Sequence, residues 1–115
     1  EPVGPYSQAI LHGNTLYSSG QIAIDPKTNS LVLDSIEKET HQVMKNIEAI
    51  LAAAKMNWDN VIKCSIFLSD MNNFSEINEI YASYFTNSYP ARETVEVACL
   101  PKNVNVEISF IAILD

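Results

Sequence analysis

The chain has 115 residues, of which 47% are hydrophobic, and a formal net charge of −7 at pH 7. This length suits one domain over residues 1–115, and the apolar share excludes an intrinsically disordered chain. The charge argues against nucleic acid as a partner, because phosphate binding needs clustered cations and this chain has only seven lysines and arginines.

The cysteine content bears on the compartment. Cys64 and Cys99 are too few for a disulfide framework and lack metal-ligand spacing. Both lie in apolar runs, so we expect buried free thiols, which suits a reducing compartment such as the cytoplasm. No signal peptide or bilayer-spanning apolar run is present, so no membrane is expected as a partner. Because the chain starts at Glu1 without a methionine, a trimmed targeting segment and a mitochondrial location stay open.

The N-terminal part of the chain has the pattern of a β-hairpin. Residues 8–24 form two strand-like runs joined by a tight turn at His12-Gly13-Asn14, since glycine and asparagine accept positive φ. Residues 25–30, with the sequence DPKTNS, are expected to form a polar loop.

A long helix is predicted next, over residues 34–56. Asp34 or Ser35 can cap its first turn, and Glu37 and Glu39 are placed well for the helix dipole. One apolar stripe recurs at spacings of three and four residues. The stripe consists of Ile36, Thr40, Val43, Ile47, Ile50, Leu51 and Ala54.

The second half of the chain alternates strands with one more helix. Residues 60–70 are almost continuously apolar, which is typical of a strand covered on both faces. Residues 72–85 predict a second helix. Residues 92–100 and 105–115 predict two further strands, and Asn103 marks the turn between them.

The predicted order is therefore β-β-α-β-α-β-β, which indicates an α+β fold with a mixed sheet and both helices on one face. The last strand is apolar on both of its faces, because Ile111 and Ile113 alternate with Phe110, Ala112 and Leu114. Since two helices can cover only one face, we expect the other face to pack against further copies of the chain.

Arg92 is the only arginine of the sequence and follows Pro90-Ala91, where a loop meets a predicted strand. Its guanidinium is always charged and can hold a carboxylate through two parallel hydrogen bonds. Binding residues collect where loops leave rigid elements, which favours a site for a small organic acid. The alternative is a surface arginine paired with Glu93 or Glu96.

Glu107 is the second candidate residue. It shares strand parity with Asn105 and Ser109, so these three side chains are expected on one face of the sheet. A carboxylate inside an apolar strand is costly unless it is paired or its proton affinity is raised for use. Glu107 could activate a water molecule if Arg92 anchors an electrophile nearby. The alternative is an edge-strand glutamate that faces water.

The other candidates are weaker. His12 and His41 show no ligand spacing and are expected at the surface. The SSGQ segment, Ser18 to Gln21, is either a bulge or a stretch of backbone that approaches a ligand. The sequence has no Ser/His/Asp order, no glycine-rich phosphate loop and no metal cluster.

Four segments together resemble the Rid/YjgF family of reactive-intermediate deaminases, formerly labelled L-PSP endoribonucleases. They are GPYSQAI, SGQI, FLSDMNNFSEINEIYASYF and PARETVEVACLPKNVNVEI, and the match covers essentially the whole chain in order. The resemblance implies a chorismate-mutase-like α+β fold and a homotrimer with ligand clefts between neighbouring subunits. The sheets of such trimers face inward, which accounts for a sheet that is apolar on both faces.

The resemblance also implies the reaction, which is hydrolysis of enamine and imine intermediates such as 2-aminoacrylate to 2-keto acids and ammonia. Small 2-imino and 2-enamino acids are then the partners, and no metal or organic cofactor takes part. Two other functions stay open: an endoribonuclease or translation inhibitor, and a non-catalytic trimeric binding or chaperone-like module. The net charge of −7 speaks against the nuclease.

By position in the family motifs, Arg92 resembles the arginine that clamps the substrate carboxylate. Glu107 resembles the carboxylate that positions the attacking water. Tyr6, in GPYSQ, matches the tyrosine that closes the cleft from the adjacent subunit, and Ser19 and Gly20 match the residues whose hydroxyl and backbone line it.

Three further positions complete the comparison with the family pattern. Asn78 matches a helix asparagine that helps order the trimer contact. Thr94 stands where many relatives have cysteine, but its backbone N–H can still contact the ligand, so we expect activity with altered preference. Cys99 replaces a second arginine of some relatives, so any contact made by that arginine is missing here.

Overall fold

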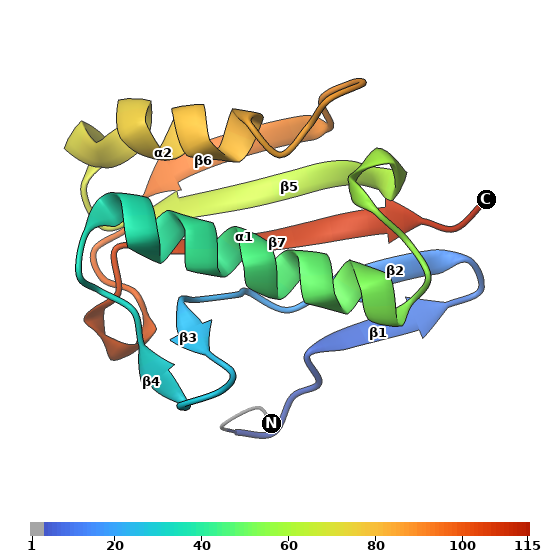
Figure 1. The fold of residues 1–115 in the computed structure, drawn as a ribbon, viewed down its shortest axis with the longest axis horizontal. Coiled ribbons are helices and arrows are strands. Elements are labelled where there is room, and N and C mark those ends of the chain that lie inside the picture. Colours follow the sequence, from blue (N-terminus) through green and yellow to red (C-terminus); the bar gives the residue numbers. More distant parts are fainter. Residues whose placement is uncertain (1–3) are drawn as a thin grey trace.

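A computed structural model describes residues 4–115 of the chain. Apart from two additional short strands before the first helix, the elements follow the predicted order, with a mixed sheet and two helices (Figure 1). The strands are β1 (Ala9–His12), β2 (Thr15–Ser18), β3 (Ile24–Asp25), β4 (Ser30–Leu31), β5 (Val61–Leu68), β6 (Ala91–Glu96) and β7 (Val106–Ile113). The helices are α1 (Ile36–Ala53) and α2 (Phe74–Ala82), with short 3-10 turns at Trp58–Asn60, Met71–Asn73 and Pro101–Asn103.

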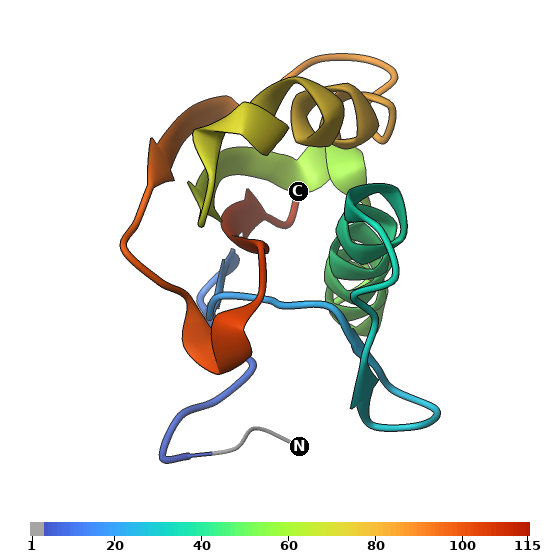
Figure 2. The same ribbon diagram turned by 90° about the vertical axis from the view of Figure 1, so that its left-hand side faces the viewer.

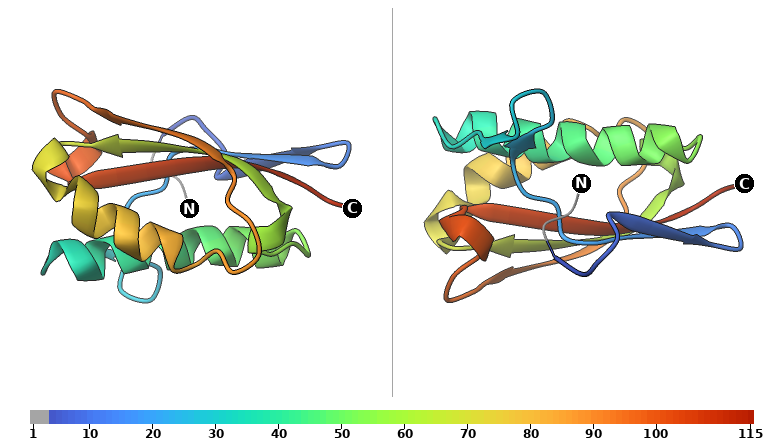
Figure 3. Two further views of the ribbon diagram at one scale, coloured as in Figure 1. Left: turned by 90° about the horizontal axis from the view of Figure 1, so that it is seen from above. Right: turned by 90° about the horizontal axis from the view of Figure 1, so that it is seen from below.

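The main sheet has five strands in the order β1-β2-β7-β5-β6. Only β5 and β6 run parallel, and the other neighbours are antiparallel. Both helices lie on the same side of the sheet, as the views from above and below show (Figure 3). The view from one end shows the same two layers (Figure 2). The predicted α+β architecture is thus confirmed.

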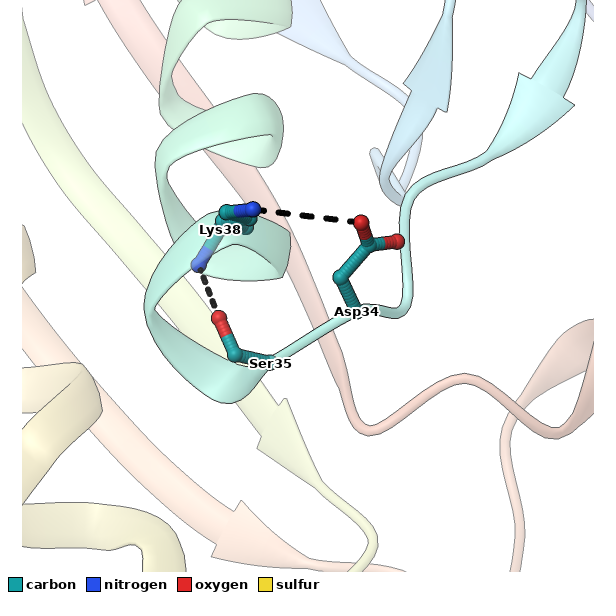
Figure 4. Close-up of polar contacts among 3 residues, drawn as sticks. All are labelled: Asp34, Ser35 and Lys38. Carbon is teal, nitrogen blue, oxygen red and sulfur yellow. Dashed lines mark hydrogen bonds and ion pairs between the residues drawn. The ribbon is translucent and has the colours of Figure 1, made fainter.

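The start of α1 is fixed by its N-cap. Ser35, in extended conformation, accepts a hydrogen bond from the backbone N–H of Lys38 at 3.1 Å (Figure 4). Asp34 instead forms an ion pair with the Lys38 ammonium at 3.9 Å. Both side chains of this pair are exposed, so it contributes little to stability. Of the two predicted caps, Ser35 is therefore the one used.

The predicted apolar stripe of α1 faces the sheet. Its central members Val43, Ile47 and Leu51 are fully buried, and its ends are partly buried. On α2, Ile77 and Tyr81 are buried in the same way. The helical periodicity of the sequence therefore identified the core-facing side of α1.

One fully buried residue of α1 is a carboxylate rather than an apolar side chain. Glu39 was expected to serve the helix dipole, but it accepts hydrogen bonds from the backbone N–H of Asn105 at 2.8 Å and of Val106 at 3.3 Å. It also accepts one from the Asn105 side-chain amide at 2.7 Å. Asn105 therefore binds α1, and the prediction that it shares a sheet face with Glu107 and Ser109 is wrong for this residue, because it lies just before β7.

The strand predictions need three further corrections. The polar loop lies inside a small hairpin, because Ile24–Asp25 pairs with Ser30–Leu31. The strand predicted over 92–100 ends at Glu96, where the chain leaves β5 after a last hydrogen bond from Val97 N–H to the Leu68 carbonyl at 2.8 Å. The turn near Asn103 is present, but β5 lies between the two strands that it connects.

The sheet face away from the helices is open. In β7 the residues Val106, Ile108, Phe110 and Ala112 are buried, whereas the alternate residues are only half-buried. The strand β5 shows the same alternation, so the prediction that it is covered on both faces is wrong for one chain alone.

This open sheet face carries a row of apolar side chains. Ile10 lies opposite Tyr17, and Tyr17 lies opposite Ile111, across β1, β2 and β7. Ile10 and Tyr17 are 54% and 47% exposed, which is high for large apolar side chains within a sheet. Such a surface is typical of a face that packs against another protein chain.

Candidate functional site

Arg92 lies at the edge of the sheet, in an open cleft of about 490 Å³ between β6 and α2. The described residues that line this cleft are Asn78, Tyr81, Ala82, Tyr89, Pro90 and Arg92. Arg92 is the one charged residue among them. A cleft with a single fixed cation in largely apolar surroundings suits a small monoanion.

The guanidinium of Arg92 is held by uncharged groups. Its central carbon lies 5.3 Å from the centre of the Tyr81 ring and 5.6 Å from that of the Phe74 ring. The Nη1 group donates a short hydrogen bond to the Asn78 side-chain oxygen. The sequence suggested a subunit contact for Asn78, and the structure places it on the guanidinium of its own chain.

The alternative of an ion pair between Arg92 and a neighbouring glutamate is not observed. Glu93 projects from the other face of β6, where it accepts a hydrogen bond from Ser65 and pairs with Lys63 at 2.9 Å. These two partners lower the pKa of Glu93. Glu96 accepts a hydrogen bond from the backbone N–H of Met71 at 2.7 Å. The guanidinium therefore keeps its charge available to a ligand.

The floor beneath Arg92 is neutral. Burial raises the pKa of the Cys64 thiol to about 11, and burial is also the main cause of the raised pKa of the Tyr81 hydroxyl. Both groups are therefore uncharged at physiological pH. Cys64 is buried as predicted, whereas Cys99 is exposed, because the chain has already left the sheet at that point.

Glu107 lies on the open face of the sheet, at the second residue of β7. Its side chain is half-buried, and desolvation raises the pKa of its carboxyl group. This matches the prediction of a carboxylate with increased proton affinity. A group of this kind is suited to accept a proton from water near neutral pH.

Gly20 lies directly against this carboxylate. A Cβ atom at position 20 would be 2.5 Å from Cδ and 2.9 Å from Cγ of Glu107, well inside van der Waals contact. Only a glycine leaves room for the observed position of the carboxylate. The SSGQ segment thus brings backbone close to the candidate carboxylate, and its predicted approach to a ligand stays a prediction.

Gln21 is a residue of this region that sequence reasoning passed over. It is 6% exposed, and its amide nitrogen donates to the Gln8 side-chain oxygen at 3.1 Å and to the Ser19 carbonyl at 3.2 Å. Its backbone exchanges two hydrogen bonds with Ile108, the residue after Glu107. The side chain therefore ties the N-terminal segment and the SSGQ segment to β7. The sequence did offer a signal for this role, because Gln21 is a polar residue directly before the apolar residues 22–24.

The remaining predicted residues take separate positions. The Ser19 hydroxyl donates to the Gln8 carbonyl at 3.0 Å. Tyr6 is 51% exposed. Thr94 lies two residues after Arg92 and projects from the same face of β6; its hydroxyl is buried and has no hydrogen-bond partner among the described residues.

Within one chain, the two main candidates do not meet. Arg92 pairs with Cys64 on the face that α2 covers, whereas Glu107 pairs with Phe67 and projects from the open face. The register separates their backbones by about 10 Å across the sheet and about 10 Å along it. Tyr6, Ser19 and Gly20 belong to the half of the molecule that contains Glu107.

Three further observations on residues 4–115 concern the histidines, metal-binding groups and the two helices. His12 is exposed as predicted, but His41 is half-buried, with Nδ1 2.7 Å from the Tyr84 hydroxyl. No three histidine, cysteine or acidic side chains in this part of the chain lie close enough together to hold a metal ion. Neither helix is long and apolar enough to cross a membrane.

The fold is that of solved Rid-family structures. A Rid-family protein from Yersinia pestis superimposes with a TM-score of 0.95 at 51% sequence identity, and the match covers 98% of this chain and 90% of that one.

The sequence matches the family described as Endoribonuclease L-PSP over residues 1–114, and the chain belongs to this family. It is 54% identical to a RutC family protein of Pyrococcus horikoshii, over 97% of this chain and 89% of the relative. It is 45% identical to the human protein named 2-iminobutanoate/2-iminopropanoate deaminase, over 96% and 81%. The resemblance predicted from the motifs is thereby confirmed.

Proposed function

We propose that the protein hydrolyses small 2-imino and 2-enamino acids to 2-keto acids and ammonia, the activity for which its human relative is named. The observation that carries this proposal is the single guanidinium in the cleft between β6 and α2. Such a cleft selects a substrate with one carboxylate and an uncharged remainder, which is the chemistry of an imine derived from a simple amino acid.

Arg92 binds the carboxylate. A guanidinium has five N–H donors, and only one of them is occupied by Asn78. Enough donors remain for two parallel hydrogen bonds to a carboxylate, and these fix its direction as well as its position. The electrophilic carbon of the imine, which is bonded to this carboxylate, is thereby held in a defined place.

Glu107 transfers protons between the attacking water and the imine nitrogen. Water adds to the imine carbon and gives a carbinolamine, while Glu107 takes a proton from that water and passes it to the imine nitrogen. The hydroxyl proton of the carbinolamine then follows to the nitrogen as the C–N bond breaks, so that ammonia leaves and a 2-keto acid remains. The raised pKa of Glu107 suits both proton transfers.

A site that needs both residues must combine two copies of the chain, because Arg92 and Glu107 project from opposite faces of one sheet. We infer a homotrimer in which the β6 edge of one subunit approaches the open sheet face of the next. The apolar row of Ile10, Tyr17 and Ile111, of which the first two are exposed, supports this arrangement. A mass of about three times 12.8 kDa in solution is expected.

The direct test is a coupled assay. A pyridoxal-phosphate-dependent dehydratase generates 2-aminoacrylate, and release of the 2-keto acid is followed with and without the protein. Arg92→Ala and Arg92→Lys should each lower kcat/KM by at least about tenfold, because one ammonium does not replace the guanidinium fork. Glu107→Gln should lower kcat, and Glu37→Gln, at an exposed position on α1, should not.

Two results would contradict this assignment. If Arg92→Lys and Arg92→Ala both keep the parent rate, Arg92 is not the carboxylate clamp. If Glu107→Gln binds 2-oxobutyrate and still hydrolyses the imine at full rate, Glu107 is not the base. That result would favour the alternative of a module that only binds small carboxylates.

The two-chain site has a test of its own. The inactive variants Arg92→Ala and Glu107→Gln are mixed in equal amounts and reassembled. If each site takes Arg92 from one subunit and Glu107 from another, about a quarter of the sites (one half times one half) receive both native residues, and activity returns. If one chain supplied both residues, every site would stay defective and the mixture would stay inactive.

A further inference from the structure

We infer that the rings of Phe74 and Tyr81 are positioning residues for Arg92, which they hold ready for a carboxylate before any ligand arrives. This inference rests on the proposed function, since it explains how Arg92, the residue proposed to bind the substrate carboxylate, is held in place. We call the two rings the aromatic shelf.

The shelf is built from the start and the last turn of α2. Phe74 begins the helix and Tyr81 lies seven residues further on, so two helical turns place both rings on one side of α2. Arg92 lies over both rings, at 5.6 and 5.3 Å from their centres. These distances are within the range of cation–π attraction.

The chemistry of the shelf suits an anion-binding arginine. A carboxylate partner would also hold the guanidinium, but it would compete with the substrate for the same N–H groups. An aromatic face attracts the cation through its quadrupole and leaves the N–H donors free. A long, exposed arginine side chain otherwise loses considerable rotamer freedom when a ligand binds.

The two rings are anchored to different extents. Tyr81 is 3% exposed and packs against Phe85 at 5.0 Å between ring centres, so it is fixed by the core. Its hydroxyl stays neutral because burial raises its pKa, which prevents a tyrosinate from pairing with Arg92. Phe74 is only partly buried and is the ring that can be removed with less damage to the core.

The sequence offers an unusually direct readout, because Arg92 is its only arginine. In a ¹⁵N-labelled sample the arginine Nε–Hε signal comes from this residue alone. In the parent protein without ligand, ring currents of the shelf should shift this signal away from its value in an unfolded chain. Tyr81→Leu and Phe74→Leu should each move it back toward that value, and Tyr81→Phe should leave it in place.

Kinetics with the imine substrate provide the second readout. Loss of a ring should raise KM about tenfold with little change in kcat, because the clamp acts on substrate and transition state alike. Tyr81→Phe keeps the ring and should stay within about twofold of the parent. Tyr84→Leu is the matched control, since this tyrosine packs against His41 and Trp58 and should leave both KM and the Arg92 signal unchanged.

The outcomes separate this inference from the proposed function. If the Arg92 signal of folded Phe74→Leu stays where it is in the parent, and its KM is also unchanged, the aromatic shelf is refuted even if the protein is a deaminase. If Tyr81→Leu does not fold, the Phe74→Leu variant alone tests the aromatic shelf. If no variant or parent shows deaminase activity, the NMR signal and the affinity for 2-oxobutyrate, measured by titration, still show whether the shelf holds Arg92.

Discussion

Replacing Gly20 by alanine should separate activity from stability. The added methyl group would lie 2.5 Å from Cδ of Glu107, where a contact of about 3.5 Å is needed. The strain is relieved when the flexible carboxylate end moves by about 1 Å, which costs the fold little. A misplacement of this size at a reacting group lowers the rate by about a hundredfold, or about 2.7 kcal/mol in the barrier.

The assay is steady-state hydrolysis of the imine together with thermal unfolding. Gly20→Ala should lose most of its kcat and keep its melting temperature to within a few degrees. Gly13→Ala is the matched control, because a methyl group there meets nothing within 4 Å but the backbone has φ +63°. It should lower stability by about 1 kcal/mol and leave kcat unchanged.

The reasoning would be refuted by a folded Gly20→Ala protein with the kcat of the parent. Glu107 would then work from a position other than the one observed, or would have no part in the reaction. A Gly20→Ala protein that fails to fold would contradict the assumption that the carboxylate end yields before the backbone does.

Three further predictions concern stability and reactivity. Glu39→Ala should lower the free energy of unfolding in urea by about 3 kcal/mol, because three hydrogen-bond donors lose their buried acceptor, whereas the exposed Glu37→Ala should change it little. Glu107→Gln should unfold at higher urea concentration than the parent at pH 7, and this difference should disappear at acid pH; a constant difference would contradict the raised pKa. The sign follows because a carboxyl group with a raised pKa stabilises the fold when protonated and loses this contribution as the pH rises through its folded pKa. Iodoacetamide at pH 8 should alkylate the exposed Cys99 and spare Cys64, whose pKa is about 11, so mass spectrometry of the native protein should show one adduct.

The sequence predicted the elements of this fold well because their periodicities are strong. The stripe of α1 identifies the face that packs on the core, and that information is local. The pairing of β6 with β5 was not predictable in the same way, since it depends on a crossover through α2. The small hairpin formed by Ile24–Asp25 and Ser30–Leu31 was missed because two-residue strands have no period to detect.

The candidate residues were identified largely by type and by family motif. Arg92 attracted notice as the only arginine, and Glu107 as a charge in an apolar strand. Their partners could not be deduced, because Gly20 meets Glu107 and Phe74 meets Arg92 only after the chain has folded. Gln21 was passed over for the same reason, since its three acceptor atoms come from residues 8 and 19.

The buried carboxylate of Glu39 has a consequence for the alignment of β7. Its carboxylate accepts hydrogen bonds from the backbone N–H groups of Asn105 and Val106 and thereby fixes the register in which β7 begins to pair. A slip of one residue in this register would turn Glu107 toward the helices and Ile108 toward the open face. Glu39, on a helix, thus keeps Glu107, sixty-eight positions later in the chain, on the open face of the sheet.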